Sequence, residues 1–203
     1  SDTYFFTPDV DPNDNLREPY MDRMRLTKKP YIGKNTKSLY LNRNYDWSEV
    51  KISPTAQIKE MVIETDTLPE NLSEIKLKPE WIKFKFMRIT NLDPFKQVQT
   101  DSIAFDKCKL NSNVLDPMTD ELKKIQIISC DLKDKIDLSK FSNLEELHLV
   151  FTLDDLEDLK SSIEGLNLKK LVVSGDLFNT PESKEYLKSL KSKMKVEIQG
   201  PII

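Results

Sequence analysis

The chain has 203 residues, enough for one domain with a substantial core. Its 31 basic and 34 acidic residues give a net charge of -3, which argues against a general nucleic-acid binder. Only four glycines occur, so no glycine-rich phosphate loop is available, and two cysteines make no disulfide framework. No apolar run reaches the roughly 18–20 residues that span a bilayer, and the first residues do not resemble a secretory signal. We therefore expect an intracellular protein, in the cytoplasm or nucleus, with no membrane contact.

Residues 1–35 differ in composition from the rest of the chain. The first 15 residues hold four acids and no base, whereas bases outnumber acids over residues 16–37. Four prolines within the first 30 residues argue against one long helix. We expect an extended arm or cap on a domain that covers residues 36–203. The arm either packs on that domain or binds a partner, and its candidate contact residues are Tyr4, Phe5, Phe6 and Tyr20.

From residue 36 onward, one spacing of apolar residues recurs. Eight segments carry an alternation that marks a short strand with one buried face. The last apolar residues of these segments are Leu41, Ile63, Phe86, Phe105, Ile127, Leu149, Val173 and Ile198. Successive positions differ by 22, 23, 19, 22, 22, 24 and 25 residues. Strands of a β-sandwich recur every 8–12 residues or so, so each longer gap here must hold a return segment.

Return segments near the C-terminus have helical spacing. Five apolar residues after Leu149 fall on one helical face: Leu153, Leu156, Leu159, Ile163 and Leu166. Thr180 followed by Pro181 predicts the start of a second helix. Its apolar side consists of Tyr186, Leu187 and Leu190. Earlier return segments have no such spacing, so we expect loops or short turns there.

The clearest repeat begins at Leu122. Five residues, Leu122, Ile125, Ile127, Cys130 and Leu132, spell L-x-x-L-x-L-x-x-C-x-L, the pattern of a leucine-rich repeat. The chain resembles the leucine-rich-repeat superfamily over residues 36–203. The resemblance implies an α/β solenoid of about seven to eight irregular repeats, with a parallel sheet on the concave face and helices or loops on the convex face. The aromatic and lysine substitutions resemble fungal F-box/leucine-rich-repeat proteins, here without an F-box.

Few residues suit catalysis or metal binding. Cys108 and Cys130 occupy the same repeat position, where the side chain turns inward and serves backbone groups; a redox pair or metal site is the alternative. His148 is the only histidine and lies on the outward side of its strand. Lys83 and Lys85 flank Phe84, which is typical either of a solvated strand or of RNA binding. We expect no enzyme activity, no metal and no cofactor.

Outward positions of the strands form columns across neighbouring repeats. In the third segment, with Phe86 as its last inward residue, the outward positions are Lys83, Lys85 and Met87. Exposed apolar residues in a cluster mark interaction sites, and such a cluster is predicted on three later strands. The predicted partner-binding residues on the concave face are Lys124, Gln126, Ile128, Glu146, His148, Val150, Lys170 and Val172.

These features predict a non-catalytic protein–protein recognition module, a subunit or substrate-receptor part of a larger complex. Protein partners are expected on the concave face and on the arm. One alternative is a structural scaffold subunit buried in a stable assembly. A nucleic-acid-associated factor is the other alternative, disfavoured by the balanced charge.

Overall fold

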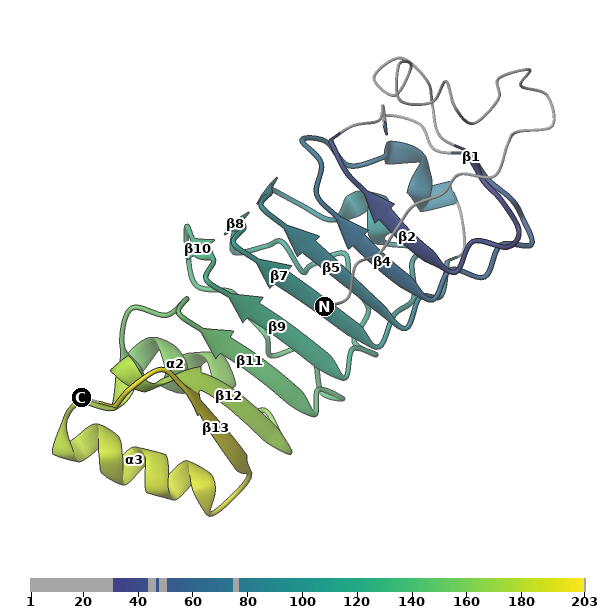
Figure 1. Cartoon of the computed structure of the whole chain (residues 1–203). Coiled ribbons are helices and arrows are strands. Elements are labelled where there is room, and N and C mark those ends of the chain that lie inside the picture. The colour runs from purple at the N-terminus through teal and green to yellow at the C-terminus, as the bar shows by residue number, and fades with distance from the viewer. Residues whose placement is uncertain (1–30, 44–46, 48–50, 75–76, 203) are drawn as a thin grey trace.

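A computed structural model of the chain describes residues 31–43, 47, 51–74 and 77–202 (Figure 1). The dominant element is an eight-stranded parallel sheet, in which each strand lies beside the preceding one. Its strands are β2 (Ser38–Leu41), β4 (Glu60–Ile63), β5 (Trp81–Lys85), β7 (Ser102–Asp106), β9 (Lys124–Ile128), β11 (Glu146–Val150), β12 (Lys170–Ser174) and β13 (Lys195–Gln199). The fold is therefore α/β and solenoid-like, with the eight strands that the repeat spacing predicts.

Shorter elements connect these strands. A second, three-stranded parallel sheet consists of β6 (Arg88–Ile89), β8 (Lys109–Leu110) and β10 (Asp131–Leu132), and β1 (Tyr31–Ile32) pairs with β3 (Lys51–Ile52). Three 3-10 turns follow strands: η2 (Glu70–Glu74), η3 (Asp93–Phe95) and η4 (Gly175–Phe178). Of the predicted arm, residues 1–30, and with them Tyr4, Phe5, Phe6 and Tyr20, lie outside the described residues. Ile32, also assigned to the arm, is fully buried in the core.

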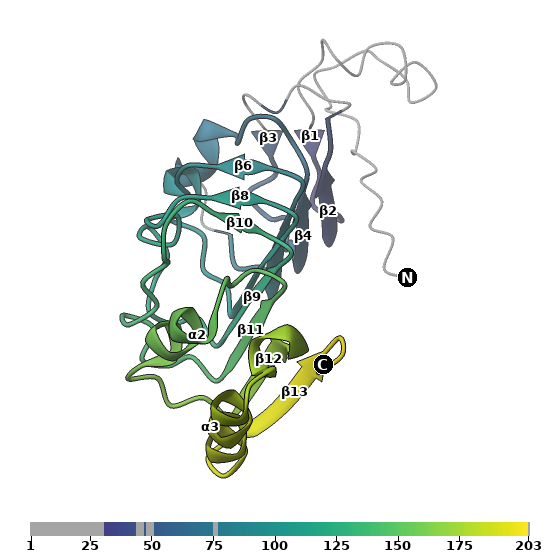
Figure 2. The same ribbon diagram turned by 90° about the vertical axis from the view of Figure 1, so that its left-hand side faces the viewer.

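Two helices complete the C-terminal return segments, as the sequence predicts. Helix α2 (Leu156–Ile163) is capped by Asp155, whose side chain accepts a hydrogen bond from the backbone N–H of Asp158. Helix α3 (Pro181–Lys191) begins at Thr180, whose side chain and that of Ser183 form a capping box. Figure 2 shows α2 on the same side of the large sheet as the small sheet.

The core lies between the large sheet and the return segments. Inward strand residues and the buried residues of both helices belong to one continuous hydrophobic cluster. At its middle the Phe84 and Phe105 rings stack with centroids 5.3 Å apart, and Phe95 meets Phe84 edge-on at 5.3 Å. The opposite side of the large sheet, which we call the outer face, therefore carries the remaining, outward side chains.

The third strand is shifted by two residues from its predicted frame. Phe84, and not Phe86, lies in register with Ile63 and Phe105. The steps between equivalent residues there become 21 and 21, from 63 to 84 and from 84 to 105. The outward residues of β5 are consequently Trp81, Lys83 and Lys85, while Met87 is buried. Both frames alternate apolar residues, and stacking of Phe84 on Phe105 selects the observed one.

Each central strand ends in the same tight turn. Phe86, Lys107, Ser129 and Phe151, all non-glycine residues two positions beyond the last inward residue, adopt positive φ angles of 50–53°. The backbone N–H groups of the first three donate to carbonyls of the neighbouring strand's end at 2.8–3.0 Å. One residue later, the thiols of Cys108 and Cys130 point inward and donate to two backbone carbonyls each. The predicted inward placement of both cysteines is therefore confirmed.

Candidate functional site: the outer face of the sheet

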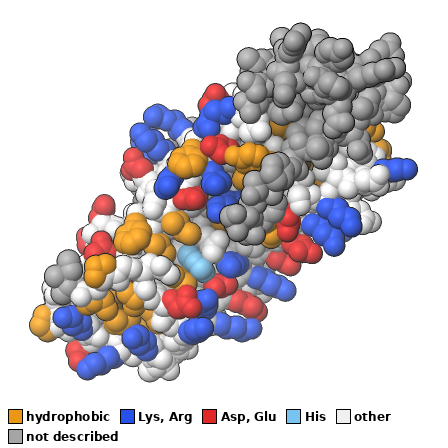
Figure 3. All heavy atoms as spheres, in the orientation of Figure 1, with side chains coloured by type: hydrophobic (Ala, Val, Ile, Leu, Met, Phe, Trp, Pro, Cys, Tyr) orange, Lys and Arg blue, Asp and Glu red, His pale blue; other side chains and the backbone are white. Residues whose placement is uncertain are grey.

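The eight predicted binding residues come from three neighbouring strands. Register pairs Lys124 with Glu146 and Glu146 with Lys170, and it pairs Gln126 with His148. Adjacent strands lie about 4.8 Å apart, so the structure brings these residues together as rows across the outer face. Figure 3 views this face, with the histidine in pale blue beside lysine and glutamate side chains.

A chain of ion pairs runs across the first of these rows. Glu146 lies 3.5 Å from the Lys124 ammonium and 3.3 Å from that of Lys170. Lys170 also lies 3.4 Å from Glu197, which in turn lies 3.7 Å from Lys195. Two carboxylates thus link three lysines over β9, β11, β12 and β13. This part of the outer face is ordered and close to neutral.

His148 lies within the same network. Its Nε2 is 3.1 Å from Glu146 and its Nδ1 is 3.1 Å from the Gln126 amide. Burial lowers the pKa of His148, against the opposing pull of the Glu146 carboxylate. Burial alone would raise the pKa of Glu146, but its hydrogen bond to His148 and the two lysine charges outweigh that and bring it to about 2. Glu146 is therefore the electrostatic centre of this face.

The prediction that Val150 and Val172 are exposed is wrong. Only 5% of Val150 and 2% of Val172 is accessible, although neither belongs to the core cluster. Val172 lies in register between His148 and Glu197, and Val150 lies beside Ile128. A valine side chain is short, so its exposure on a sheet depends on what lies over it as well as on the direction in which it points. Ile128 is the remaining partly exposed apolar residue of the predicted set.

Large exposed hydrophobic residues lie instead where strands end. Phe86 is 46% exposed and Phe151 is 55% exposed, and both occupy the positive-φ turn. Figure 3 shows hydrophobic side chains gathered along this edge of the sheet. The sequence prediction missed them because it assigned Phe86 to the core. The signal was available for Phe151, an aromatic residue two positions beyond the inward Leu149.

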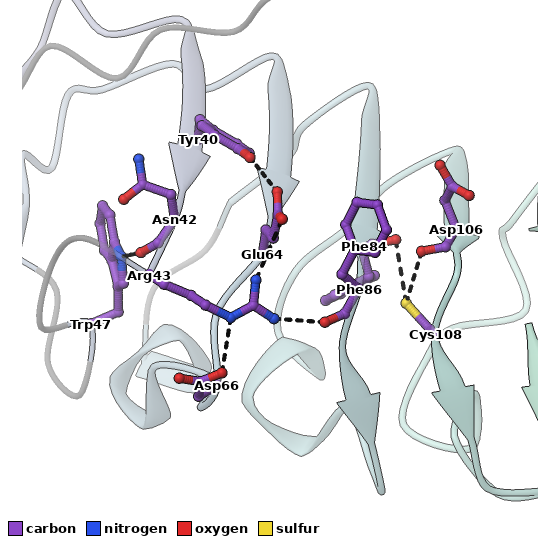
Figure 4. Close-up of polar contacts among 10 residues, drawn as sticks. All are labelled: Tyr40, Asn42, Arg43, Trp47, Glu64, Asp66, Phe84, Phe86, Asp106 and Cys108. Atoms are coloured by element: carbon purple, nitrogen blue, oxygen red, sulfur yellow. Dashed lines mark hydrogen bonds and ion pairs between the residues drawn. The ribbon is translucent and has the colours of Figure 1, made fainter.

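Phe86 makes contacts through both its backbone carbonyl and its ring. Its carbonyl accepts a 2.6 Å hydrogen bond from Arg43, which also contacts Glu64 and Asp66 (Figure 4). The Lys107 and Lys85 ammonium groups lie 5.2 Å and 6.0 Å from the centroid of its ring.

Tyr40 donates its hydroxyl hydrogen bond to the same Glu64 (Figure 4). Burial, and then that bond, raise the pKa of Tyr40 to about 12. This phenol therefore stays protonated and links β2 to the end of β4. Its hydrogen bond also helps to hold Glu64, the carboxylate that pairs with Arg43.

A cavity of about 540 Å³ opens between β10 and the start of α2. Buried Ile127 and Leu149 contribute to its lining, and Asp131, Lys133 and Asp154 also line it. Because the lining carries both carboxylates and lysines, its charge does not favour one class of ligand over another. In the part of the chain that the structure describes, no group of histidine, cysteine and carboxylate side chains could hold a metal ion.

Comparisons with known proteins identify no relative. No protein-family model, no curated protein and no solved structure matches the chain. Within the described ranges, no helix is both long and apolar enough to cross a membrane.

Proposed function

We propose that this chain is a non-catalytic recognition module that binds another protein through the outer face of its large sheet, within a larger intracellular complex. The observation that carries the proposal is the continuity of that face. Eight parallel strands in sequential order place outward side chains in register from one end of the sheet to the other. Stacked repeats use extended surfaces of this kind for binding.

The finer architecture proposed is a leucine-rich-repeat solenoid, with the outer face as its concave side. Support comes from equivalent strand positions 21–25 residues apart. Cys108 and Cys130 also fill the inward position that this repeat reserves for asparagine or cysteine. Resemblance to substrate receptors of the F-box type makes a substrate-receptor part the specific role within this proposal.

Absence of enzyme activity is part of the proposal. His148, the chain's only histidine, is engaged by Glu146 and Gln126. The thiols of Cys108 and Cys130 are buried and hydrogen-bonded to backbone carbonyls. In triads of the Ser-His-Asp or Cys-His type an imidazole is hydrogen-bonded to the nucleophile, whereas the partners of His148 are a carboxylate and an amide.

A permanent structural subunit of a stable assembly is the second candidate. The exposed rings of Phe86 and Phe151 favour it, because large apolar side chains at a surface mark places that a partner covers. A chain that aggregates on its own and becomes soluble only when co-expressed with a partner would support this candidate over a reversible receptor.

The proposal is tested by affinity capture with a variant of the outer face. The whole chain and its Lys124→Glu/Ile128→Asp variant are used as bait in a cell lysate, and recovered proteins are quantified by mass spectrometry. We expect at least one partner to be recovered by the wild type and lost from the variant. A partner that both baits recover equally would contradict binding through this part of the face.

A matched control separates loss of the surface from loss of the fold. Lys191→Glu/Ile202→Asp makes the same chemical changes at two exposed positions away from the predicted residues. The control should retain the partner. Thermal unfolding of both variants should stay within about 4 °C of the wild type, the upper end of the shift that roughly 1 kcal/mol produces in a domain of this size.

A further inference from the structure

Five basic residues lie on or directly after the strands near Phe86, and two of them, Lys85 and Lys107, lie beside its ring. Lys83 and Lys85 lie on β5, Lys107 follows β7, and Arg88 and Lys109 are register neighbours on the small sheet. Together with Phe86 they form what we call the basic edge. Among the described residues, none of these five cations forms an ion pair. In Figure 3, blue and orange side chains lie together near the ends of β5 and β7.

Four carboxylates border the basic edge. Asp106 is the register neighbour of Lys85, and Asp131 is that of Lys109. Glu64 and Asp66 pair with Arg43, which donates to the Phe86 carbonyl. Counted with Arg43, the cations there exceed the carboxylates by two, in a chain whose overall charge is -3. A positive excess that the described part of the chain leaves unpaired attracts anionic groups.

Phe86 gives this charge a fixed apolar centre. Its φ of 53° is one that residues other than glycine rarely adopt, and its ring is 46% exposed. Its N–H donates to the Asp106 carbonyl at 3.0 Å and its carbonyl accepts from Arg43, so both ends of the residue are anchored. The same φ recurs at Lys107, Ser129 and Phe151, so the turn belongs to the repeat, and Phe86 differs from them in having an exposed ring with two ammonium groups beside it.

We propose that the basic edge binds an acidic peptide segment of a partner protein. An apolar side chain of that segment packs on the Phe86 ring, and carboxylates on either side of it pair with Lys85 and Lys107. Nucleic acid fits less well, because it needs a longer stripe of cations and several stacking rings. The site shares no residue with the eight predicted on the outer face, so the two proposals succeed or fail separately.

The test selects peptides from a random twelve-residue display library on the whole chain. We expect enrichment of sequences that combine aspartate or glutamate with an apolar residue, and an affinity that falls as sodium chloride rises. Enrichment without acidic residues, or no enrichment, overturns the proposal. So does tighter binding of a twelve-nucleotide uridine RNA than of the best peptide, which would instead make the edge a nucleic-acid site.

Substitutions locate the bound peptide. Phe86→Asn removes the ring and keeps a residue type that tolerates positive φ, and we expect at least tenfold weaker binding. Phe151→Asn is the matched control, since Phe151 has the same backbone conformation and even greater exposure; its affinity should be unchanged. Equal affinity of the wild type and Phe86→Asn, or equal losses in both variants, would overturn the assignment.

The acidic residues of the chain's own first segment are a competing occupant. Replacing all four by asparagine (Asp2→Asn, Asp9→Asn, Asp11→Asn and Asp14→Asn) should leave peptide affinity within twofold of the wild type. A gain of tenfold or more would overturn the external partner and identify residues 1–15 as the ligand of the basic edge.

Discussion

The outer face across β9–β13 and the basic edge at β5–β8 use the same kinds of side chain in opposite arrangements. On the outer face, Glu146 and Glu197 pair with three lysines, and apolar Val150 and Val172 are covered. At the basic edge, five cations have no ion-pair partner among the described residues, and Phe86 is open. On the outer face the charged groups pair with one another, whereas at the basic edge the charges and the Phe86 ring are available to a partner.

This difference separates stability from recognition within one sheet. Partly buried, linked ion pairs fix side chains and reduce the charge that a partner could use. Isolated surface cations contribute little to folding, so their presence around an exposed ring is explained more readily by binding. Three comparisons, which use four variants, test the contrast, from the largest expected effect on unfolding free energy to the smallest.

Two phenylalanines test how sharply the basic edge is separated from the core. Phe84→Ala removes a fully buried ring that contacts Phe105 and Phe95, and should lower the free energy of unfolding by about 3–5 kcal/mol. Phe86→Ala, two residues later, should change it by less than about 1 kcal/mol, because that ring is half exposed. Urea denaturation measures both. Similar losses in the two variants would show that Phe86 belongs to the core.

Glu146→Gln tests the ion-paired region. The substitution leaves Lys124, Lys170 and His148 without their shared carboxylate, and should cost about 1–3 kcal/mol of unfolding free energy at pH 7. The measurement is again urea denaturation. An unchanged midpoint would mean that the ion-pair network contributes nothing measurable to the free energy of unfolding.

The same variant carries a pH signature. Because the pKa of Glu146 is lowered to about 2 from 4.5, its stabilising contribution is present above pH 4.5 and is lost as pH falls through 2. The stability gap between the wild type and Glu146→Gln should therefore close over that range. His148 acts in the same direction at higher pH, since its lowered pKa makes stability fall as pH drops below 6.5.

Lys85→Gln/Lys107→Gln should have the smallest effect. Each lysine loses only an exposed contact with the Phe86 ring. Because Phe86→Ala removes both contacts at once, their joint contribution is bounded by the loss in that variant, less than about 1 kcal/mol. The expected loss in unfolding free energy is therefore smaller than that of Glu146→Gln. A loss as large would erase the distinction between the two regions.

Sequence alone predicts the strands well, for a physical reason. Inward residues such as Ile125, Ile127, Leu147 and Leu149 alternate with polar ones, and a one-residue slip would bury the polar set. The helix start at Thr180 and the inward Cys108 and Cys130 follow equally local rules. The frame of the third strand is not predicted correctly, because Phe84 and Phe86 have the same parity along the strand. Only packing against Phe105 distinguishes them.

The candidate sites depend on neighbours that the sequence does not reveal. Val150 and Val172 are outward by strand parity and yet buried, so parity alone does not fix their exposure. The tight turns are equally hidden, because residues with positive φ are usually glycine or asparagine, and here they are Phe86, Lys107, Ser129 and Phe151. A site made by such turns becomes visible only when the strands are placed side by side.

The last strand of the large sheet has a consequence for self-association. Among the described strands β13 pairs only with β12, so its free side is a template on which another chain could add a strand. Lys195 and Glu197 stand on that strand, and charged side chains discourage such additions. We therefore expect that replacing both charges by apolar residues would favour edge-to-edge pairing of two copies of the chain.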